Sequence, residues 1–376
     1  MTGFIIDIYT PSLPAMATYF GVNKSWVQLT ITVELIAYGL FHTVVSTLAG
    51  MYGQRRILIP GLALLTLVSF LIPVSPNIIV LLILRFFQGI FICAPAAISK
   101  NLITMHYEGA ALRRNANYLM LIWALGPIFA PTIGGYLQDY FDWQASFLFI
   151  AVYSLLCTLL IAVFLPKKEK PPKPMNLKEI IRVHINLLSN KVFMISCVCL
   201  SVLFGLIVCF NVIGPFVVQV QLHYSAVVFG YTATVMGICW LFGAGIKHFL
   251  VSQELSEEKI IFVSFVFLVV FAVIMFLLSW RIADLRFVVI FSGLIVMCGS
   301  IAYPNVLTQI LWGFREHASI ANGLRGSLNI LGVSLTSLIA ASLQSQAITA
   351  LAGMYFLTGL IGILGYGLFL GAPSDK

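Results

Sequence analysis

From Pro166 to Asn190 the chain reads PKKEKPPKPMNLKEIIRVHINLLSN. This stretch holds four prolines and the densest group of basic residues in a chain of 376 residues that is otherwise 60% hydrophobic and only 9% charged. Long apolar runs lie on both sides of it. We therefore expect residues 166–190 to be a hydrophilic linker between two membrane-embedded parts, residues 1–165 and residues 191–376.

The scarcity of charge excludes several classes of protein. Charged residues make up about a quarter of an average soluble chain, whereas this chain has 21 basic and 13 acidic residues and a mean hydropathy of +1.03. Soluble enzymes, disordered chains and secreted disulfide scaffolds are therefore excluded, and the bilayer is the solvent that suits the chain. The seven cysteines lie inside apolar runs without metal-type spacing, so we expect packing residues and no metal site.

Apolar runs of the length that crosses a bilayer, about 20 residues, predict twelve spans. Six lie before the linker and six after it, and no alternating pattern of membrane strands recurs. The expected fold class is therefore all-α, a polytopic membrane protein of two six-helix bundles, with a first span that prolines interrupt and the chain start cuts short. The expected spans are residues 2–20, 27–49, 57–76, 78–101, 115–138, 145–165, 192–219, 226–250, 259–280, 285–312, 318–342 and 347–370.

Basic residues predict the orientation of the spans. With the linker in the cytoplasm, 15 Lys and Arg residues fall on the cytoplasmic side and only Lys24, Arg281 and Arg286 fall outside. This bias places both termini in the cytoplasm, in a bacterial-type inner (plasma) membrane. The net charge of +8 is thus explained without nucleic acid as a partner. Within the linker, residues 175–188 can form either an amphipathic helix on the membrane surface or an irregular tether.

Ionisable side chains inside the spans are the main functional candidates, because each costs about 2.5–3.5 kcal/mol or more in the bilayer. Five residues meet this description: Asp7, Glu34, Arg85, Lys100 and Arg325. Lys100 and Arg325 lie nearer the cytoplasmic ends of their spans, and we expect their long side chains to reach the headgroups. The proton-coupling candidates are therefore Asp7, Glu34 and Arg85.

Glu34 lies in an apolar run and shares one helix face with Thr30, Tyr38 and His42, which follow at intervals of four residues. A buried carboxylate at this position can take up and release a proton, or it can be a structural hydrogen-bond partner of a neighbouring helix. Both interpretations remain open from the residues alone.

Arg85 stays charged at its depth in span four, so it needs an acidic partner, and Glu34 and Asp7 are the acidic candidates inside the spans. Such a pair is either a coupling switch that protonation breaks or a purely structural ion pair.

Asp7 precedes Pro11 and Pro14, which remove backbone donors and leave carbonyl groups that can line a cavity. Taken alone, Asp7 is better explained as an ordinary acid at a helix start.

These residues resemble motifs of the major facilitator superfamily and, more narrowly, of its twelve-span drug:proton antiporters of the Bcr/CflA type. Residues 7–14 (DIYTPSLP) resemble the first-span pattern D-x-Y-L-P-x-L-P, and residues 85–89 (RFFQG) match the fourth-span R-x-x-Q-G. Residues 126–135 (GPIFAPTIGG) match the span-five antiporter signature G-P-x-x-x-P-x-x-G-G. The resemblance implies proton coupling through Asp7 and Arg85. It also implies a gating and antiporter motif formed by Gly126, Pro127, Pro131, Gly134 and Gly135.

The chain departs from this subfamily in three places. The loop after span two keeps Gly53, Arg55 and Arg56 of the family pattern G-x-L-x-D-R-x-G-R-R, but Gly50 and Met51 stand where the pattern has its aspartate and first arginine. The resemblance therefore implies an altered charge relay in this loop. Glu34 stands where relatives carry an aromatic residue, which implies an altered substrate or proton site. Relatives also have a longer segment before the first-span aspartate, so we expect Met1 to be a late start or the end of a truncation.

The leading functional hypothesis is a secondary active transporter, not an enzyme, that exports small amphipathic or cationic compounds in exchange for protons. No cofactor is expected besides the proton gradient; the expected partners are a small-molecule substrate and the lipid bilayer, and we expect a monomer. One alternative is a transporter of a specific metabolite, such as a siderophore or an amino-acid derivative. Another is a sensor or scaffold that has lost transport. The expected substrate contacts are Tyr38, Gln88, Trp123, Phe210, Asn211 and Asn305.

Overall fold

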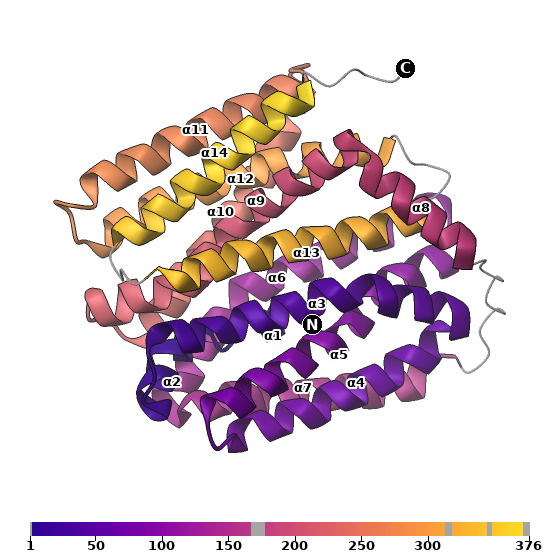
Figure 1. Cartoon of the computed structure of the whole chain (residues 1–376), viewed down its shortest axis with the longest axis horizontal. Coiled ribbons are helices and arrows are strands. Elements are labelled where there is room, and N and C mark those ends of the chain that lie inside the picture. Colours follow the sequence, from indigo (N-terminus) through magenta and orange to yellow (C-terminus); the bar gives the residue numbers. More distant parts are fainter. Residues whose placement is uncertain (1, 167–176, 313–317, 344–347, 371–376) are drawn as a thin grey trace.

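The computed structural model describes residues 2–166, 177–312, 318–343 and 348–370, and within these ranges every regular element is a helix (Figure 1). Backbone N–H and C=O groups find no water inside a bilayer, so a spanning segment is favoured when it satisfies them internally, as a helix does. The expectation of an all-α fold is confirmed.

The first half of the chain begins with a broken span. Pro11 and Pro14 each lie in the first turn of a new helical segment, where an N–H group has no partner to lose. The hydroxyl of Thr10 bridges the break by donating a 2.8 Å hydrogen bond to the carbonyl oxygen of Asp7. The elements of this half are α1 (Thr2–Asp7), η1 (Thr10–Ser12), α2 (Leu13–Phe20), α3 (Lys24–Tyr52), α4 (Gln54–Leu71), η2 (Ile72–Val74), α5 (Ile78–His106), α6 (Gly109–Phe141) and α7 (Trp143–Phe164).

The second half begins with one long helix, α9, where the first half has a broken span. Pro215 ends α9, and the chain continues there as a π-helical turn, η3. The elements are α9 (Lys191–Pro215), η3 (Phe216–Gln221), α10 (Ala226–Ser252), α11 (Glu257–Leu278), α12 (Leu285–Trp312), α13 (Ala318–Ser342) and α14 (Ile348–Leu370).

All twelve expected spans fall on these helices. By length and hydropathy, ten helices in the described ranges can cross a membrane. The other two spans are the first, which is divided among α1, η1 and α2, and α6, which carries Arg114 near its start and Asp139 near its end. The first span is divided into segments that are each shorter than a membrane-crossing helix.

The linker contains a helix, α8 (Leu177–Ser189), which lies across one end of the molecule (Figure 1). Its apolar inner face packs on α9 and α13, while Ile181 on the opposite face is 51% exposed. The amphipathic helix is thus confirmed over the described part of the linker, and residues 167–176 lie outside the described residues. The buried side chains of α8 are Ile180, Val183 and Leu187.

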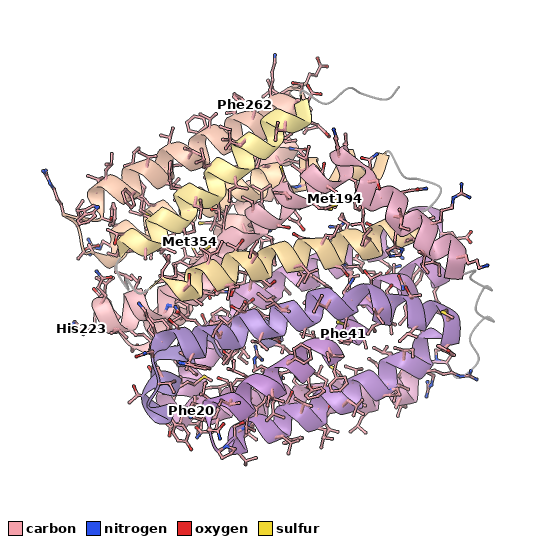
Figure 2. The ribbon with its side chains drawn as sticks, in the orientation of Figure 1. Phe20, Phe41, Met194, His223, Phe262 and Met354 are labelled. Carbon is pink, nitrogen blue, oxygen red and sulfur yellow. The ribbon has the colours of Figure 1, made fainter. Side chains whose placement is uncertain are left out.

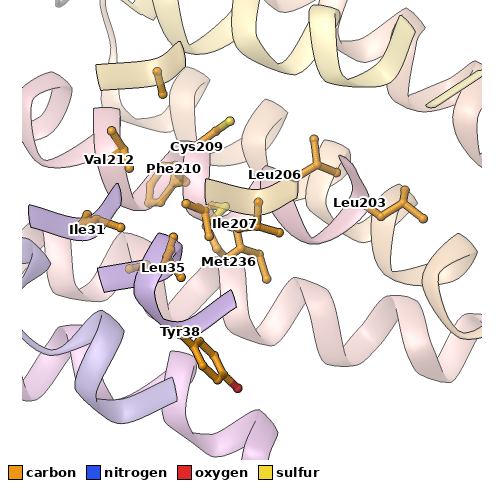
Figure 3. Close-up of a cluster of buried hydrophobic side chains, with 14 of the residues drawn as sticks. Ile31, Leu35, Tyr38, Leu203, Leu206, Ile207, Cys209, Phe210, Val212 and Met236 are labelled. Carbon is orange, nitrogen blue, oxygen red and sulfur yellow. The ribbon is translucent and has the colours of Figure 1, made fainter. Parts of the chain in front are cut away.

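Two long helix pairs join the halves: α3 packs along α13, and α6 packs along α10. On the first pair, the hydroxyls of Thr32 and Ser337 are 2.7 Å apart. Between α3 and α9 lies a cluster of buried apolar side chains that continues to α10 (Figure 3). The labelled members of this cluster are Ile31, Leu35, Tyr38, Leu203, Leu206, Ile207, Cys209, Phe210, Val212 and Met236.

Large apolar side chains also cover the outer surface of the helices (Figure 2). Phe164 is 77% exposed and Phe262 is 45% exposed, whereas Met354 on α14 is only 2% exposed. A surface of this kind would be unstable in water and is the surface that lipid chains solvate. The polar residues that matter for function are therefore found inside the molecule.

Candidate functional site

A buried ion pair joins α3 and α5. Arg85 donates a hydrogen bond through Nη2 to Oε2 of Glu34, and both side chains have no exposed surface. Because Glu34 and Arg85 neutralise each other, the desolvation cost of each charge is partly offset by attraction in a low-dielectric interior. The partner of Arg85 is therefore Glu34, one of the two acids that the sequence offered.

Other polar groups complete the surroundings of Arg85. Its Nη1 donates to Oε1 of Gln88, and Nε2 of Gln88 in turn donates a 2.8 Å hydrogen bond to the Ser69 hydroxyl on α4. The guanidinium group lies 4.2 Å from the centre of the Tyr9 ring, and the Tyr9 hydroxyl is 3.1 Å from the hydroxyl of Thr30. Cation–π contact and hydrogen bonds therefore hold the guanidinium group in one position.

One atom of this network has no partner: Oε1 of Glu34 is buried and makes no hydrogen bond within the described structure. An unsatisfied carboxylate oxygen is costly in a dry interior, and protonation removes most of that cost. The Glu34 carboxyl group therefore offers a position at which a proton can be held.

Gly89 explains how α3 and α5 come close enough for this pair. A Cβ atom at Gly89 would collide with the backbone carbonyl oxygen of Glu34. Only glycine permits this approach of two helix backbones. The short spacing between Arg85 and Gly89 on α5 thus places the guanidinium group and the close contact on neighbouring turns.

Asp7 makes a hydrogen bond between the two halves. Nδ2 of Asn211, on α9, donates a 2.7 Å hydrogen bond to Oδ1 of Asp7, whose side chain is 5% exposed. Nearby, Nε2 of Gln28 donates a 2.8 Å hydrogen bond to the carbonyl oxygen of Val212. Asp7 is also close enough to Glu34 for the two carboxylates to interact electrostatically. The three proton-coupling candidates are therefore brought together.

The glycine–proline motif of span five forms helix crossings. A Cβ atom at Gly134 would collide with the carbonyl oxygen of Ile8, and one at Gly135 would lie 2.6 Å from the carbonyl oxygen of Ala226 on α10. Gly126 similarly faces the backbone of α1 at Phe4. Despite Pro127 and Pro131, α6 stays helical throughout. The residues of this motif therefore let α6 approach α1 and α10 closely.

The expected substrate contacts do not all meet at one place. Gln88 and Asn211 belong to the two polar clusters above. Trp123 on α6 lies under the ammonium group of Lys100, 4.5 Å from Nζ to the ring centre. Phe210 is 1% exposed and stacks on Phe229 at 5.8 Å, inside the apolar cluster.

The two remaining contact candidates are also buried. Asn305 on α12 has no exposed surface, and its Nδ2 donates a 3.2 Å hydrogen bond to the carbonyl oxygen of Ile301 in its own helix. Tyr38 is 5% exposed, and its hydroxyl points away from the apolar cluster of Figure 3. Its ring contacts that of His42 with the centroids 5.6 Å apart.

The second half contains an aromatic cluster that the sequence did not single out. The rings of Trp240 on α10 and Tyr303 on α12 have centroids 5.6 Å apart, and Phe204 on α9 lies 6.3 Å from Trp240. Asn329 on α13 donates a 3.4 Å hydrogen bond to the Tyr303 hydroxyl. In the sequence, Tyr303 precedes Pro304 and Asn305, and this pattern could have indicated Tyr303. Trp240 stands in no such pattern, and aromatic residues are too common in spans for one tryptophan to indicate a site.

The loop motif has a structural role in the first half. Gly53 joins α3 to α4 with φ at +102°, a conformation that favours glycine. Arg55 donates to the carbonyl oxygens of Leu165 and Ala162, the latter at 2.7 Å, at the C-terminal end of α7. A cation at a helix C-terminus satisfies free carbonyl groups and the helix dipole. Arg56 is exposed.

A hollow of about 710 Å³ opens between the halves at the end opposite α8, with Lys24, Asp139 and Gln219 among its lining residues. Nε2 of Gln219 donates a 2.8 Å hydrogen bond to the carbonyl oxygen of Pro11, so the two halves also meet beside this hollow. In the described ranges, no group of His, Cys, Asp and Glu side chains is arranged to hold a metal ion.

Comparisons with known proteins agree with this architecture. The family model of the Major Facilitator Superfamily matches residues 1–337. A bicyclomycin resistance protein homolog of Haemophilus influenzae is 25% identical over 96% of this chain and 92% of its own length. The MFS-type transporter YdgK of Bacillus subtilis is 24% identical over 96% of this chain and 90% of its own length. Multidrug resistance protein D of Escherichia coli is 25% identical over 44% of this chain and 42% of its own length.

Proposed function

The chain belongs to the major facilitator superfamily and is a multi-pass secondary transporter, and on this premise we propose that it exports small amphipathic or cationic compounds in exchange for protons. The observation that carries the proposal is the hydrogen bond between Asp7 and Asn211. This bond joins the two halves through a group whose charge depends on a proton.

Protonation of Asp7 would change the balance between conformations. The ionised carboxylate is a strong acceptor for Asn211, and adding a proton removes its charge and weakens that bond. Because the bond crosses between the halves, its weakening favours conformations in which α1 and α9 separate. A proton that binds one conformation better than another shifts the population toward it, which is the requirement for coupling.

The Glu34–Arg85 pair supports the same mechanism. Asp7, Glu34 and Arg85 together carry one net negative charge when both acids are ionised, and one proton makes the group neutral. Burying a neutral group is cheaper than burying a charged one, so each cycle of proton uptake and release changes the cost of closing the halves around these residues. The free Oε1 atom of Glu34 gives a second position for the proton.

The direction of transport and the substrate class rest on the span-five motif and on the relatives. Gly134 and Gly135 lie at the crossings that join α6 to α1 and α10, as an antiporter motif that affects gating requires. Two relatives are named for resistance to bicyclomycin or to multiple drugs. These observations favour export of foreign amphipathic compounds over uptake of a nutrient.

We further propose an orientation in a bacterial inner membrane. The end with α8 faces the cytoplasm together with both termini, so that residues 166–190 link the bundles formed by residues 1–165 and 191–376 on that side. The excess of basic residues in these loops supports this placement. The protein is proposed to work as a monomer, because the sites described above lie between the halves of one chain.

Full-length protein reconstituted in liposomes with an imposed pH gradient tests the proposal. Ethidium serves as a cationic probe and chloramphenicol as a neutral amphipathic probe. The wild type is expected to dissipate the gradient when a probe is added, whereas Asp7→Asn and Arg85→Ala are not, and Glu254→Gln, at an exposed residue, serves as the control. Counterflow of a probe without any gradient response would reject proton coupling. Absence of both would favour a sensor.

A further inference from the structure

Two cationic side chains, Lys100 and Arg325, take part in none of the contacts described for proton coupling. Lys100 on α5 lies over the ring of Trp123 on α6, and Arg325 lies on α13 of the other half. Both are close enough to His42 on α3 for their charges to interact with it, and Lys100 and Arg325 interact with each other. Helices of both halves therefore contribute to the surroundings of these two groups.

Contacts between α3 and α13 fix Arg325 at this level. The hydroxyl of Thr43 lies 2.5 Å from that of Ser327 and donates a 3.1 Å hydrogen bond to the carbonyl oxygen of Gly323. A Cβ atom at Gly326 would lie 3.0 Å from the His42 ring. Arg325 lies between Gly323 and Ser327 in the chain. Its part of α13 therefore cannot rotate away from α3 without breaking these contacts.

Among the described residues, no acid forms an ion pair with Lys100 or Arg325. The ion pair of Glu34 with Arg85 is the only salt bridge among the described residues, and it uses the acid nearest to His42 along α3. Nε of Arg325 is buried and has no hydrogen-bond partner in the described structure. Two like charges close together repel unless an anion lies between them or one of them loses its proton. The side chain of Lys100 is exposed, so an anion can reach it.

An apolar surface lies one helical turn deeper in the molecule. Tyr38 precedes His42 by one turn of α3 and is close enough to Tyr303 to interact with it electrostatically. Tyr303 in turn contacts Trp240. A compound whose charged end met Lys100 and Arg325 would therefore place its body against aromatic rings, which bind flat apolar groups well.

We propose that Lys100 and Arg325 form a binding site for the carboxylate or phosphate of a transported compound, at the end of the molecule where α8 lies. This inference rests on the proposed transport function and adds to its substrates amphipathic compounds that carry an acidic group, zwitterions included. The acidic group contacts both halves at once, so its binding also favours the conformation in which α5 and α13 lie close. An anionic lipid headgroup has the same chemistry, and the experiment separates the two sources.

Binding of three matched compounds to the full-length protein tests the inference. The compounds are 1-naphthoate, its neutral amide 1-naphthamide, and 1-naphthylmethylammonium, which share one aromatic body. Radiolabelled compounds are bound to protein in phosphatidylcholine nanodiscs, with and without phosphatidylglycerol. We expect 1-naphthoate to bind at least about tenfold more tightly than the other two compounds. Lys100→Gln and Arg325→Gln are each expected to remove that preference while binding of the amide stays unchanged, and Lys259→Gln, at an exposed lysine, is the control.

Three results would overturn the inference. Equal affinity for the three compounds would show that no anion site exists. A preference for 1-naphthoate that survives both substitutions would place the site elsewhere. Loss of 1-naphthoate binding only when phosphatidylglycerol is present would assign the site to a lipid headgroup. Binding needs no proton gradient, so these results are independent of the gradient assay with Asp7→Asn, and Lys100→Arg serves as the variant that keeps the charge if Lys100→Gln fails to fold.

Discussion

Asp7 accepts a 2.7 Å hydrogen bond from Asn211, and the two residues lie 204 positions apart on opposite halves of the molecule. In the proposed mechanism this bond breaks when the halves separate, and its strength changes with one proton. It therefore links a chemical event at a single carboxylate to the arrangement of two bundles.

Asp7→Asn is expected to separate exchange from coupling. Asparagine keeps the size of the side chain and an acceptor oxygen for Asn211, but it cannot ionise. Counterflow of ethidium between liposome compartments should therefore continue, whereas uphill transport driven by a pH gradient should fall by at least about tenfold. Both rates are measured on the same preparation, and equal loss of both would instead indicate a structural role.

Glu34→Gln is expected to destabilise the protein strongly. The substitution leaves Arg85 buried without its counter-ion, and removing one partner of a buried pair costs about 3–5 kcal/mol. The melting temperature in detergent should fall, and the double variant Glu34→Gln/Arg85→Gln should recover part of the loss because no charge is then left unpaired. A double variant less stable than either single variant would contradict this account. If Glu34→Gln left stability, export and pH dependence unchanged, no role would remain for Glu34.

Gly134→Ala is expected to disrupt the crossing of α6 with the first span. Its Cβ atom would collide with the carbonyl oxygen of Ile8, which is backbone and cannot rotate away. A penalty of about 3 kcal/mol is expected from such overpacking. Gly245→Ala on α10 is the matched control, since nothing lies within 4 Å of the added atom there and alanine favours a helix by up to about 1 kcal/mol. Melting temperatures of the two variants should therefore move apart.

Arg55→Gln should weaken the packing of α4 on α7, whereas Arg56→Gln should not. Arg55 donates to two carbonyl oxygens at the end of α7, and hydrogen bonds from a charged donor contribute about 1.5–3 kcal/mol. Arg56 is exposed, and substitutions at such positions stay within about 0.5 kcal/mol. Thermal unfolding in detergent distinguishes the two arginines. Equal effects would show that the motif acts through its total charge and not through the contact with α7.

The sequence predicted the spans, and it predicted that Arg85 pairs with either Glu34 or Asp7, because both predictions depend on local properties. Hydropathy marks a span wherever the helix lies, and an arginine buried in span four must find one of very few acids. The partner of Asp7 depends instead on the register between α1 and α9, which are far apart in the chain, and no pattern in the sequence reports that register. Phe210 shows the same limit, since its ring stacks on Phe229 within the core while its neighbour Asn211 reaches Asp7.

The aromatic cluster in the second half could not be predicted for a different reason. Trp240, Phe204 and Tyr303 come from three helices, and each alone resembles an ordinary packing residue. For Lys100 and Arg325 the sequence indicates only the depth in the span, and the expectation that they reach the headgroups stays a prediction. The surroundings of each side chain depend on how α5 and α13 pack against α3, and the sequence does not indicate that packing.

The crossing of α6 and α10 limits how the halves can move. Gly135 lies against Ala226, and Gly230 and Gly237 of α10 lie against Pro131 and Ile128, so the two backbones touch over several turns. Sliding along this contact by one residue would bring a side chain onto backbone, but tilting about it would not. Close backbone packing at this crossing therefore resists sliding of one half along the other more than it resists tilting about α6 and α10.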